Sequence, residues 1–163
     1  MVSSRPMIMM LFLKRVEIDL CSRRPESARR FLLVGVAQTP AANQLGLEHR
    51  VFVLNTKPDP IVCFNPKIVH YSEKYAVTEE GCLTFPGLFV KIRRPQWIRV
   101  RFHEADGSMR TETLNGLAAR AFQHELDHLD GVNYLSRAKK IHMDQAKKKQ
   151  KLIDRKLKRM QLA

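Results

Sequence analysis

Short apolar runs bounded by polar and turn-forming residues dominate the middle of the chain. Residues 51–54, 61–64 and 88–92 are three such runs, each of a length typical of a β-strand. Residues 98–103 alternate between apolar and polar side chains, which is typical of a strand with one face in water. An Asp-Gly turn signal follows, and residues 109–114 complete a predicted hairpin. This region is therefore predicted to form antiparallel sheets.

The apolar spacing changes from strand-like to helical after this hairpin. Ala118, Phe122, Leu126 and Leu129 recur at roughly the spacing of one helix face, and Gly131 is a suitable stop residue. Strands followed by one such helix indicate an α+β fold, with small, mostly antiparallel sheets around a central helix.

The central helix carries the sequence His-Glu-Leu-Asp-His at residues 124–128. His124 and His128 are four positions apart, so both imidazoles lie on one helix face and can bind one metal ion. Glu125 then lies close enough to a water on that metal to take its proton. The alternative is a buried helix that carries two histidines without a metal.

A catalytic metal site of this kind needs a third protein ligand. A longer metalloprotease pattern adds a histidine at the position that Tyr134 occupies here, and a phenol is a poor substitute for an imidazole. The best remaining candidate is Cys82, because a thiolate binds divalent first-row metals strongly. The alternative for Cys82 is an ordinary buried thiol.

Two motifs together resemble one known family. Residues 80–87 read EGCLTFPG and residues 124–131 read HELDHLDG, and this pair is similar to the peptide deformylase family. The remaining motif of that family usually reads GxGLAAxQ. Residues 37–44 read AQTPAANQ here, so the second half matches, while both glycines and the leucine do not. The resemblance extends from Ala41 to about Arg137.

The resemblance implies an enzyme that hydrolyses the N-formyl group from the N-terminal methionine of newly made polypeptides and releases formate. It implies one divalent metal bound by Cys82, His124 and His128. The metal is usually iron(II) in the family, and zinc, nickel and cobalt also suit two nitrogens and a sulfur. Glu125 would act as the base and then pass its proton to the leaving amine.

The resemblance also assigns roles to further residues. The oxyanion would be stabilised by the metal, the Leu83 backbone N–H and the Gln44 side-chain amide. The residues expected around the peptide substrate are Thr39, Glu80, Gly81, Thr84, Phe85, Leu117 and Ala121. Arg94 would pair with Asp127 behind the metal, and the alternative for Arg94 is an ordinary surface charge.

The length fits one domain, within which the composition distinguishes three segments. Residues 1–40 form a divergent N-terminal segment, residues 41–136 form the catalytic core, and residues 137–163 form a basic tail. The tail holds 11 Lys or Arg against two Asp, which gives +9 of the formal net charge of +13.

Apolar residues of the tail fall near one helical stripe, which predicts an amphipathic basic helix. They are Ala146, Ile153, Leu157 and Met160. Such a helix is either a solvated helix end or an electrostatic contact with RNA phosphates. By the family resemblance, the tail is similar to a C-terminal helix that docks on the ribosome near the peptide exit.

The cysteines and the apolar runs bear on the compartment. Cysteines at 21, 63 and 82 form no CxxC pair, which favours a reducing, intracellular compartment. We expect a cytoplasmic monomer with no membrane partner, since no apolar run approaches the ~18 residues that a membrane helix needs. The run at residues 7–13 is interpreted as a buried strand or an extended N-terminus, with an organellar targeting peptide as the alternative.

Two other functional classes stay open at this stage. One is a general zinc peptidase that uses the same helix, although Tyr134 and the EGCL sequence count against it. The other is a non-catalytic ribosome- or RNA-binding relative that lost activity through the altered first motif. The abrupt change near Pro40 reflects either real divergence or an error in the reading frame. We expect the altered motif to weaken substrate binding while the metal chemistry stays intact.

Overall fold

The computed structural model describes residues 41–46, 48–54, 60–82 and 84–161. It has the predicted α+β architecture, with two antiparallel sheets and a central helix. The predictions for residues 1–40 and for Leu83 lie outside these described residues. They stay predictions.

The larger sheet has four antiparallel strands in the order β1-β2-β5-β6. Its strands are β1 (Val51–Leu54), β2 (Ile61–Tyr71), β5 (Trp97–His103) and β6 (Met109–Asn115). Each apolar or alternating run that predicted a strand in these parts of the chain lies in one of them. The β5–β6 hairpin closes with the Gly107 N–H donating to the carbonyl of Glu104 at 3.0 Å.

The smaller sheet is a hairpin of β3 (Tyr75–Cys82) and β4 (Phe85–Pro95). The sequence predicted β4 but not β3, which carries two adjacent glutamates and no regular alternation. The hairpin is tight at its far end, where Cys82 pairs with Phe85. The last residue of β3 is therefore held in place by β4.

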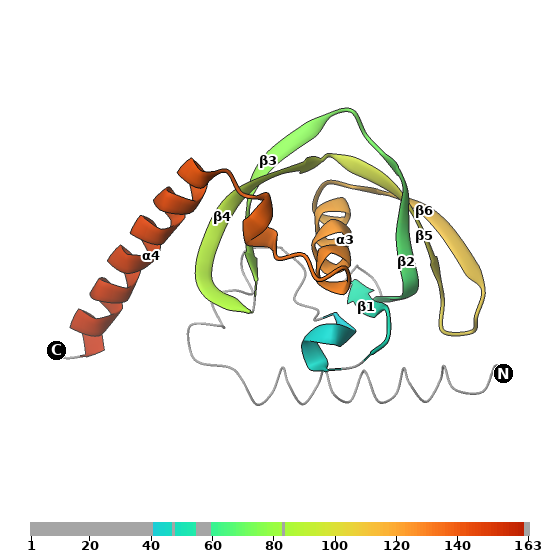
Figure 1. Cartoon of the computed structure of the whole chain (residues 1–163), viewed down its shortest axis with the longest axis horizontal. Coiled ribbons are helices and arrows are strands. Elements are labelled where there is room, and N and C mark those ends of the chain that lie inside the picture. The colour runs from blue at the N-terminus through green and yellow to red at the C-terminus, as the bar shows by residue number, and fades with distance from the viewer. Residues whose placement is uncertain (1–40, 47, 55–59, 83, 162–163) are drawn as a thin grey trace.

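The chain crosses between the two sheets at one corner. The Ser72 N–H donates to the carbonyl of Trp97 at 3.0 Å, and the Gln96 N–H donates to the carbonyl of Lys74 at 2.9 Å. The Ser72 hydroxyl donates to the Lys74 carbonyl at 2.7 Å and accepts the Trp97 N–H at 3.2 Å. These bonds fix the bend, so the two sheets enclose the space between them (Figure 1).

Helix α3 (Gly116–Leu129) lies in that space, as Figure 1 shows. It starts at the residue after β6, and Gly116 has the positive φ of 54° that glycine adopts without strain. The Gly116 N–H donates to the carbonyl of Gln96 at 2.9 Å, which ties the helix start to the corner. Gly131, the predicted stop residue, has φ +70° just beyond the helix end.

One side of α3 packs against the four-stranded sheet through apolar side chains. Phe122 meets Phe52 edge to face, with ring centroids 5.1 Å apart, and both rings are fully buried. Phe102, Ile98 and Val100 belong to the same cluster. Replacing a core phenylalanine such as Phe122 by alanine lowers the free energy of unfolding by about 3–5 kcal/mol. A rotation of α3 that exposed this ring would lose comparable burial, so the contact stabilises the observed orientation of the helix.

The other side of α3 turns buried polar side chains toward the β3–β4 hairpin. They are Arg120, Gln123, His124 and Asp127. Buried polar groups require partners, and the partners of several of these side chains come from the hairpin. The helix thus has an apolar half that fixes its place and a polar half that faces the hairpin.

Helix α4 (Lys140–Gln161) lies on the outer side of β4 (Figure 1). Ala146 is buried against the β4 cluster, Gln150 donates to the carbonyl of Pro86 at 3.2 Å, and Lys149 pairs with Glu79 at 3.5 Å. The predicted helix is present, but its predicted stripe is only partly buried because Ile153 is 44% exposed. The side chains of residues 156–161 lie outside the described part of the chain.

Two short 3-10 helices complete the described elements, η2 (Ala42–Leu45) and η3 (Tyr134–Arg137). η2 packs against α3, and η3 packs against β4. Within the described residues, no helix is both long enough and apolar enough to cross a membrane.

Candidate metal centre

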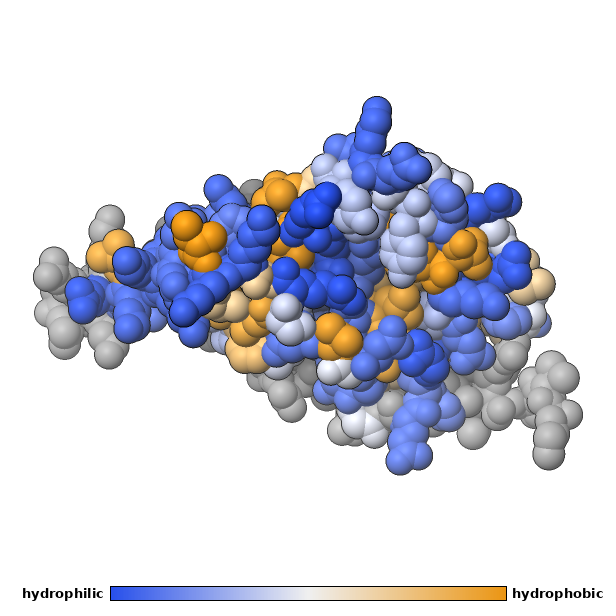
Figure 2. Space-filling model, turned by 45° about the horizontal axis from the view of Figure 1, so that its top comes forward, coloured by the Kyte–Doolittle hydropathy of each residue, from blue (hydrophilic) through white to orange (hydrophobic). Residues whose placement is uncertain are grey.

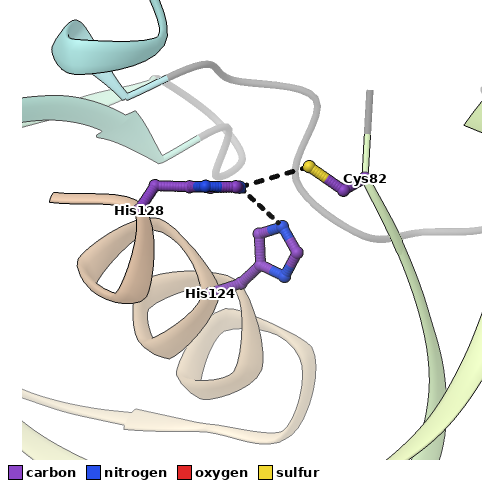
Figure 3. A group of neighbouring side chains, drawn as sticks. All are labelled: Cys82, His124 and His128. Atoms are coloured by element: carbon purple, nitrogen blue, oxygen red, sulfur yellow. Dashed lines mark hydrogen bonds between the residues drawn. The ribbon is translucent and has the colours of Figure 1, made fainter. Parts of the chain in front are cut away.

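The β3–β4 hairpin and α3 bring Cys82, His124 and His128 together (Figure 3). Cys82 is the last residue of β3, and the two histidines lie one turn apart on α3. The Cys82 Sγ atom lies 3.2 Å from His128 Nε2, which lies 3.2 Å from His124 Nε2. The three candidate ligand atoms all lie within 4.8 Å of one another.

These three side chains fit a divalent metal. Bond lengths of about 2.3 Å to sulfur and 2.0–2.1 Å to nitrogen, at tetrahedral angles, place neighbouring donors roughly 3.3–3.6 Å apart. The observed 3.2 Å separations are close to those values. Three protein donors also leave a fourth position open, as catalytic sites of this type do.

Electrostatics favour the ligand form of the thiol. Burial opposes ionisation of Cys82, but hydrogen bonds from His124 and His128 outweigh it and lower the pKa of the thiol. The bond to Cys82 and a bond to Glu80 raise the pKa of His124, again against the effect of burial. A metal ligand must be deprotonated, and the lowered pKa of Cys82 favours its thiolate form.

Glu80 lies behind His124 and orients its ring. Its Oε2 atom lies 3.2 Å from His124 Nδ1, so a proton on Nδ1 leaves Nε2, which lies 3.2 Å from His128 Nε2, free to bind a metal. Glu80 is fully buried, and bonds from His124 and Arg94 hold the pKa of its carboxyl below the ordinary value despite burial. Glu80 was expected around the substrate, but its carboxylate is directed into the protein.

Arg94 joins Glu80 to Asp127 within this buried region. It donates to Glu80 through Nε at 2.7 Å and Nη2 at 2.9 Å, and to Asp127 through Nη1 at 2.8 Å. Arg94 is therefore buried and paired behind the metal site, and the surface-charge alternative does not hold. Asp127 also accepts two bonds from Arg137, at 2.7 and 2.5 Å.

Two arginines of this cluster, Arg120 and Arg137, were missed in the sequence. Arg120 precedes His124 by four positions and so lies on the same helix face, directly behind the first histidine. That spacing was visible in the sequence. Arg137 follows the helix by a loop and η3, so its contact with Asp127 is set by tertiary structure alone.

Glu125 follows His124 on α3 and keeps one buried carboxyl oxygen without a hydrogen-bond partner among the described residues. Its side chain is 2% exposed, and its Oε2 atom has no hydrogen-bond partner among the described residues. Burial raises the pKa of Glu125, with His124 opposing and Cys82 reinforcing the shift. A carboxyl in this setting is suited to accept and return a proton.

Gln44 places an amide group beside two of the three candidate ligands. Its Nε2 atom lies 3.3 Å from His128 Nε2 and 3.9 Å from Cys82 Sγ, and it donates to the Thr84 hydroxyl at 3.1 Å. The neighbouring Asn43 side chain donates to the carbonyl of His128. The Gln44 N–H₂ group therefore lies against the candidate metal centre.

Tyr134 is not a ligand in this arrangement. Its ring is buried 5.5 Å from the His124 ring, but its hydroxyl donates to the carbonyl of Leu88 at 2.9 Å. The phenol thus packs beside the site and bonds to β4.

A family model for polypeptide deformylase matches residues 33–144 of this chain. The chain belongs to the polypeptide deformylase family. A peptide deformylase of Thermotoga petrophila is 44% identical over 97 residues, which cover 60% of this chain and 59% of that protein. A peptide deformylase of Bradyrhizobium diazoefficiens is 43% identical over 94 residues, which cover 58% of this chain and 54% of that protein. The chain thus spans less than two thirds of the length of these relatives.

Solved deformylase structures have the same fold. The crystal structure of peptide deformylase from Thermotoga maritima aligns with a TM-score of 0.67 at 34% identity and covers 82% of each chain. A Synechococcus elongatus peptide deformylase, solved in complex with actinonin, aligns with a TM-score of 0.64 at 32% identity. It covers 69% of this chain and 62% of that chain.

The remaining residues that deformylase resemblance placed around the substrate have different environments. Leu117 is 56% exposed at the start of α3, whereas Ala121 is buried one turn later. The Thr84 hydroxyl accepts from Gln44, and Phe85 packs near the Tyr134 ring. Gly81 lies between Glu80 and Cys82 on β3.

Proposed function

We propose that this chain is a metal-dependent peptide deformylase. It hydrolyses the N-formyl group of an N-terminal methionine in newly made polypeptides, and formate and a free amine are the products. The observation that carries this proposal is a cluster of three candidate metal donors with an amide donor beside it and a buried carboxyl on the same helix, one oxygen of which has no hydrogen-bond partner among the described residues. The donors belong to Cys82, His124 and His128, the amide to Gln44 and the carboxyl to Glu125.

Cys82, His124 and His128 are the residues that hold the metal in this proposal. Iron(II) is the ion we propose from the family likeness, and zinc(II), nickel(II) and cobalt(II) also suit two nitrogens and a sulfur. When bound, such an ion lowers the pKa of a water molecule and draws charge from the formyl oxygen.

Glu125 acts as the general base and then as the general acid. It accepts a proton from the attacking water as the water oxygen bonds to the formyl carbon, and it returns that proton to the amine nitrogen as the C–N bond breaks. The buried Oε2 atom of Glu125 supports this cycle, because it has no hydrogen-bond partner among the described residues and is free to accept the proton. Gln44 donates to the oxyanion, with the Leu83 N–H as the second donor.

Turnover of a formyl-methionyl tripeptide tests this function, with the unformylated tripeptide alongside. We expect formate and a new free amine from the formylated peptide and no product from the other. Cleavage of a peptide bond in either substrate would favour a general peptidase. Retained RNA binding without any hydrolysis would favour a non-catalytic relative.

We further propose that α4 contacts ribosomal RNA near the peptide exit, and that the protein works as a cytoplasmic monomer. Lys147, Lys148 and Lys151 are exposed on α4, while Ala146 faces β4. Hydrophilic residues cover most of the visible surface of this helix (Figure 2). Packing by Ala146 and Gln150 holds the helix against the domain, so its lysines are presented on a fixed support.

A further inference from the structure

The guanidinium of Arg120 is buried between α3 and the β3–β4 hairpin, with 4% of the residue exposed. Its Nη1 atom donates to Glu80 Oε1 at 2.5 Å and to the carbonyl of Ile92 at 3.2 Å. Its Nη2 atom donates to the carbonyl of Ala76 at 2.9 Å. One helix side chain therefore binds a carboxylate and two backbone carbonyls of the hairpin.

We propose that Arg120 is a positioning residue for the metal centre, which holds the strand of Cys82 at the correct distance from the helix of His124 and His128. The proposal rests on the proposed function only in taking these three residues as metal ligands.

The need for such a residue follows from where the ligands lie. Both histidines belong to α3, whereas Cys82 belongs to the other layer, so the gap between layers sets the sulfur-to-nitrogen distances. Metal–ligand bonds tolerate deviations of only about 0.2 Å. The apolar half of α3 packs on the four-stranded sheet and leaves this gap to the polar contacts on its other side.

Glu80 connects Arg120 to two ligands at once. It stands two positions before Cys82 on β3, and its Oε2 atom contacts His124 Nδ1. Its Oε1 atom accepts from both Arg120 and Arg94. The position of this carboxylate therefore affects both the strand that ends in the thiolate and the orientation of the first imidazole.

Arg94 does not duplicate the role of Arg120. Arg94 lies on the same hairpin as Glu80, and it reaches α3 at Asp127, three positions beyond His124. Arg120 reaches in the opposite direction, from the helix to both strands of the hairpin, one turn before His124. The two bridges thus bracket His124, and loss of either allows the hairpin to tilt about the other.

The planar fork of arginine suits this task. A lysine ammonium keeps the positive charge but is a compact donor that cannot match three acceptors spread across two strands. We therefore expect Arg120→Lys to keep part of the function and Arg120→Met, which keeps an unbranched side chain without a charge, to keep less. Gln123→Met is the matched control, because Gln123 is buried on the same helix but, in the described structure, reaches the hairpin only at the carbonyl of Pro95, the last residue of β4, and bonds neither Glu80 nor a proposed ligand.

The test uses cobalt(II) as the probe metal in the full chain. Its dissociation constant is measured by chelator competition, its thiolate and ligand-field absorption bands report ligand geometry, and thermal melting reports stability. We expect Arg120→Met to weaken cobalt binding about 10- to 100-fold and to shift the bands. The cobalt affinity of Arg120→Lys should lie between those of Arg120→Met and the wild type. Gln123→Met should unfold at a lower temperature, with unchanged cobalt affinity and unchanged absorption bands.

Wild-type cobalt affinity and bands in Arg120→Met would overturn the proposal. So would a Gln123→Met variant with the same losses, because the effect would then follow stability alone. If Arg120→Met does not fold, Arg120→Lys decides by the same two measurements. A wild type that binds cobalt but releases no formate from the formyl peptide overturns the proposed function alone, and one that binds no metal overturns both.

Discussion

The side-chain nitrogen of Gln44 lies 3.3 Å from the Nε2 atom of His128, although 84 positions separate the two residues. The Gln44 carbonyl oxygen accepts the N–H of Ala41 at 2.9 Å, and this bond sets the direction of the amide. The half of the first motif that matches the family pattern therefore lies at the metal centre.

Substitution of each proposed ligand should remove the metal. We expect Cys82→Ser, His124→Ala and His128→Ala each to weaken binding by more than about 100-fold, because even the residues behind a ligand contribute 10- to 100-fold. Metal content after gel filtration and chelator competition measure this. Cys63→Ser is the control, since Cys63 is buried in the other core cluster. Full metal content and activity in Cys82→Ser would show that the assignment is wrong.

Removal of the metal should make Cys82, but not Cys63, reactive as a thiol. Hydrogen bonds from both histidines lower the pKa of Cys82 despite burial, so the metal-free protein carries a thiolate there at neutral pH. Burial raises the pKa of Cys63, which therefore stays protonated and inert. Peptide mapping after iodoacetamide treatment should find Cys82 modified and Cys63 intact, and added metal should protect Cys82. Equal labelling with and without metal would contradict a thiolate ligand.

Glu125→Gln should separate metal binding from catalysis. The amide cannot accept the proton of the water, so we expect kcat to fall about 10²- to 10⁴-fold while the metal content stays near that of the wild type. Steady-state formate release and metal analysis on the same sample measure both quantities. Glu112→Gln, on β6, is the control carboxylate. Near-normal turnover by Glu125→Gln would rule out its role as the base.

Neutral substitutions on α4 should weaken ribosome binding without changing chemistry. Deletion after Lys140 would also remove Met143 and Ala146, which pack in the cluster that contains Cys82, so substitution is the cleaner test. The test variant replaces the exposed lysines Lys147, Lys148 and Lys151 by glutamine. We expect the slope of log affinity against log salt to fall by about 2–3, with unchanged kcat/KM on a short formyl peptide.

A control variant for α4 removes the same three charges from the four-stranded sheet. It replaces Lys67, Arg99 and Arg101 by glutamine. If both triple variants lose ribosome affinity equally, net charge rather than this helix governs binding. Salt-independent binding by the unaltered protein would favour a helix that is merely solvated.

Rebuilding the first motif should improve substrate binding. Thr39 stands where the family has its second glycine, and Pro40 follows it without an N–H to donate. An unpaired buried partner costs about 1–3 kcal/mol, so Ala37→Gly, Thr39→Gly and Pro40→Leu combined should raise kcat/KM roughly 5- to 150-fold, mainly through KM. No gain in the rebuilt variant would mean that the divergent segment already accepts the substrate.

The sequence predicted those parts of the fold in which local pattern and tertiary structure agree. The apolar run at 51–54 and the Asp-Gly turn before β6 specify their strands locally. The spacing of His124 and His128 on a helix made one side of the metal centre predictable. Cys82 was predicted from its thiolate chemistry and from the family motifs, because it stands 42 residues before His124 and no local pattern connects the two.

The rest depended on contacts that local pattern does not encode. Strand β3 pairs along its length with β4. Its glutamates hid the strand pattern in the sequence, because Glu80 is buried and bonded to Arg94 and Arg120 rather than exposed. The apolar spacing on α4 predicted the helix but not its packing, since Ala146 is buried whereas Ile153 is 44% exposed. Arg120 was overlooked because a charged residue in an apolar helix is usually assigned to the surface.

The direct passage from Asn115 at the end of β6 to Gly116 at the start of α3 restricts where the chain can change in length. Each residue of a helix turns about 100° around its axis, so one inserted residue at this junction would swing both imidazoles away from Cys82. The turn at residues 104–108 has no such constraint, because its hairpin extends away from the helix. Insertions and deletions among related chains should therefore collect in that turn and be absent from the junction.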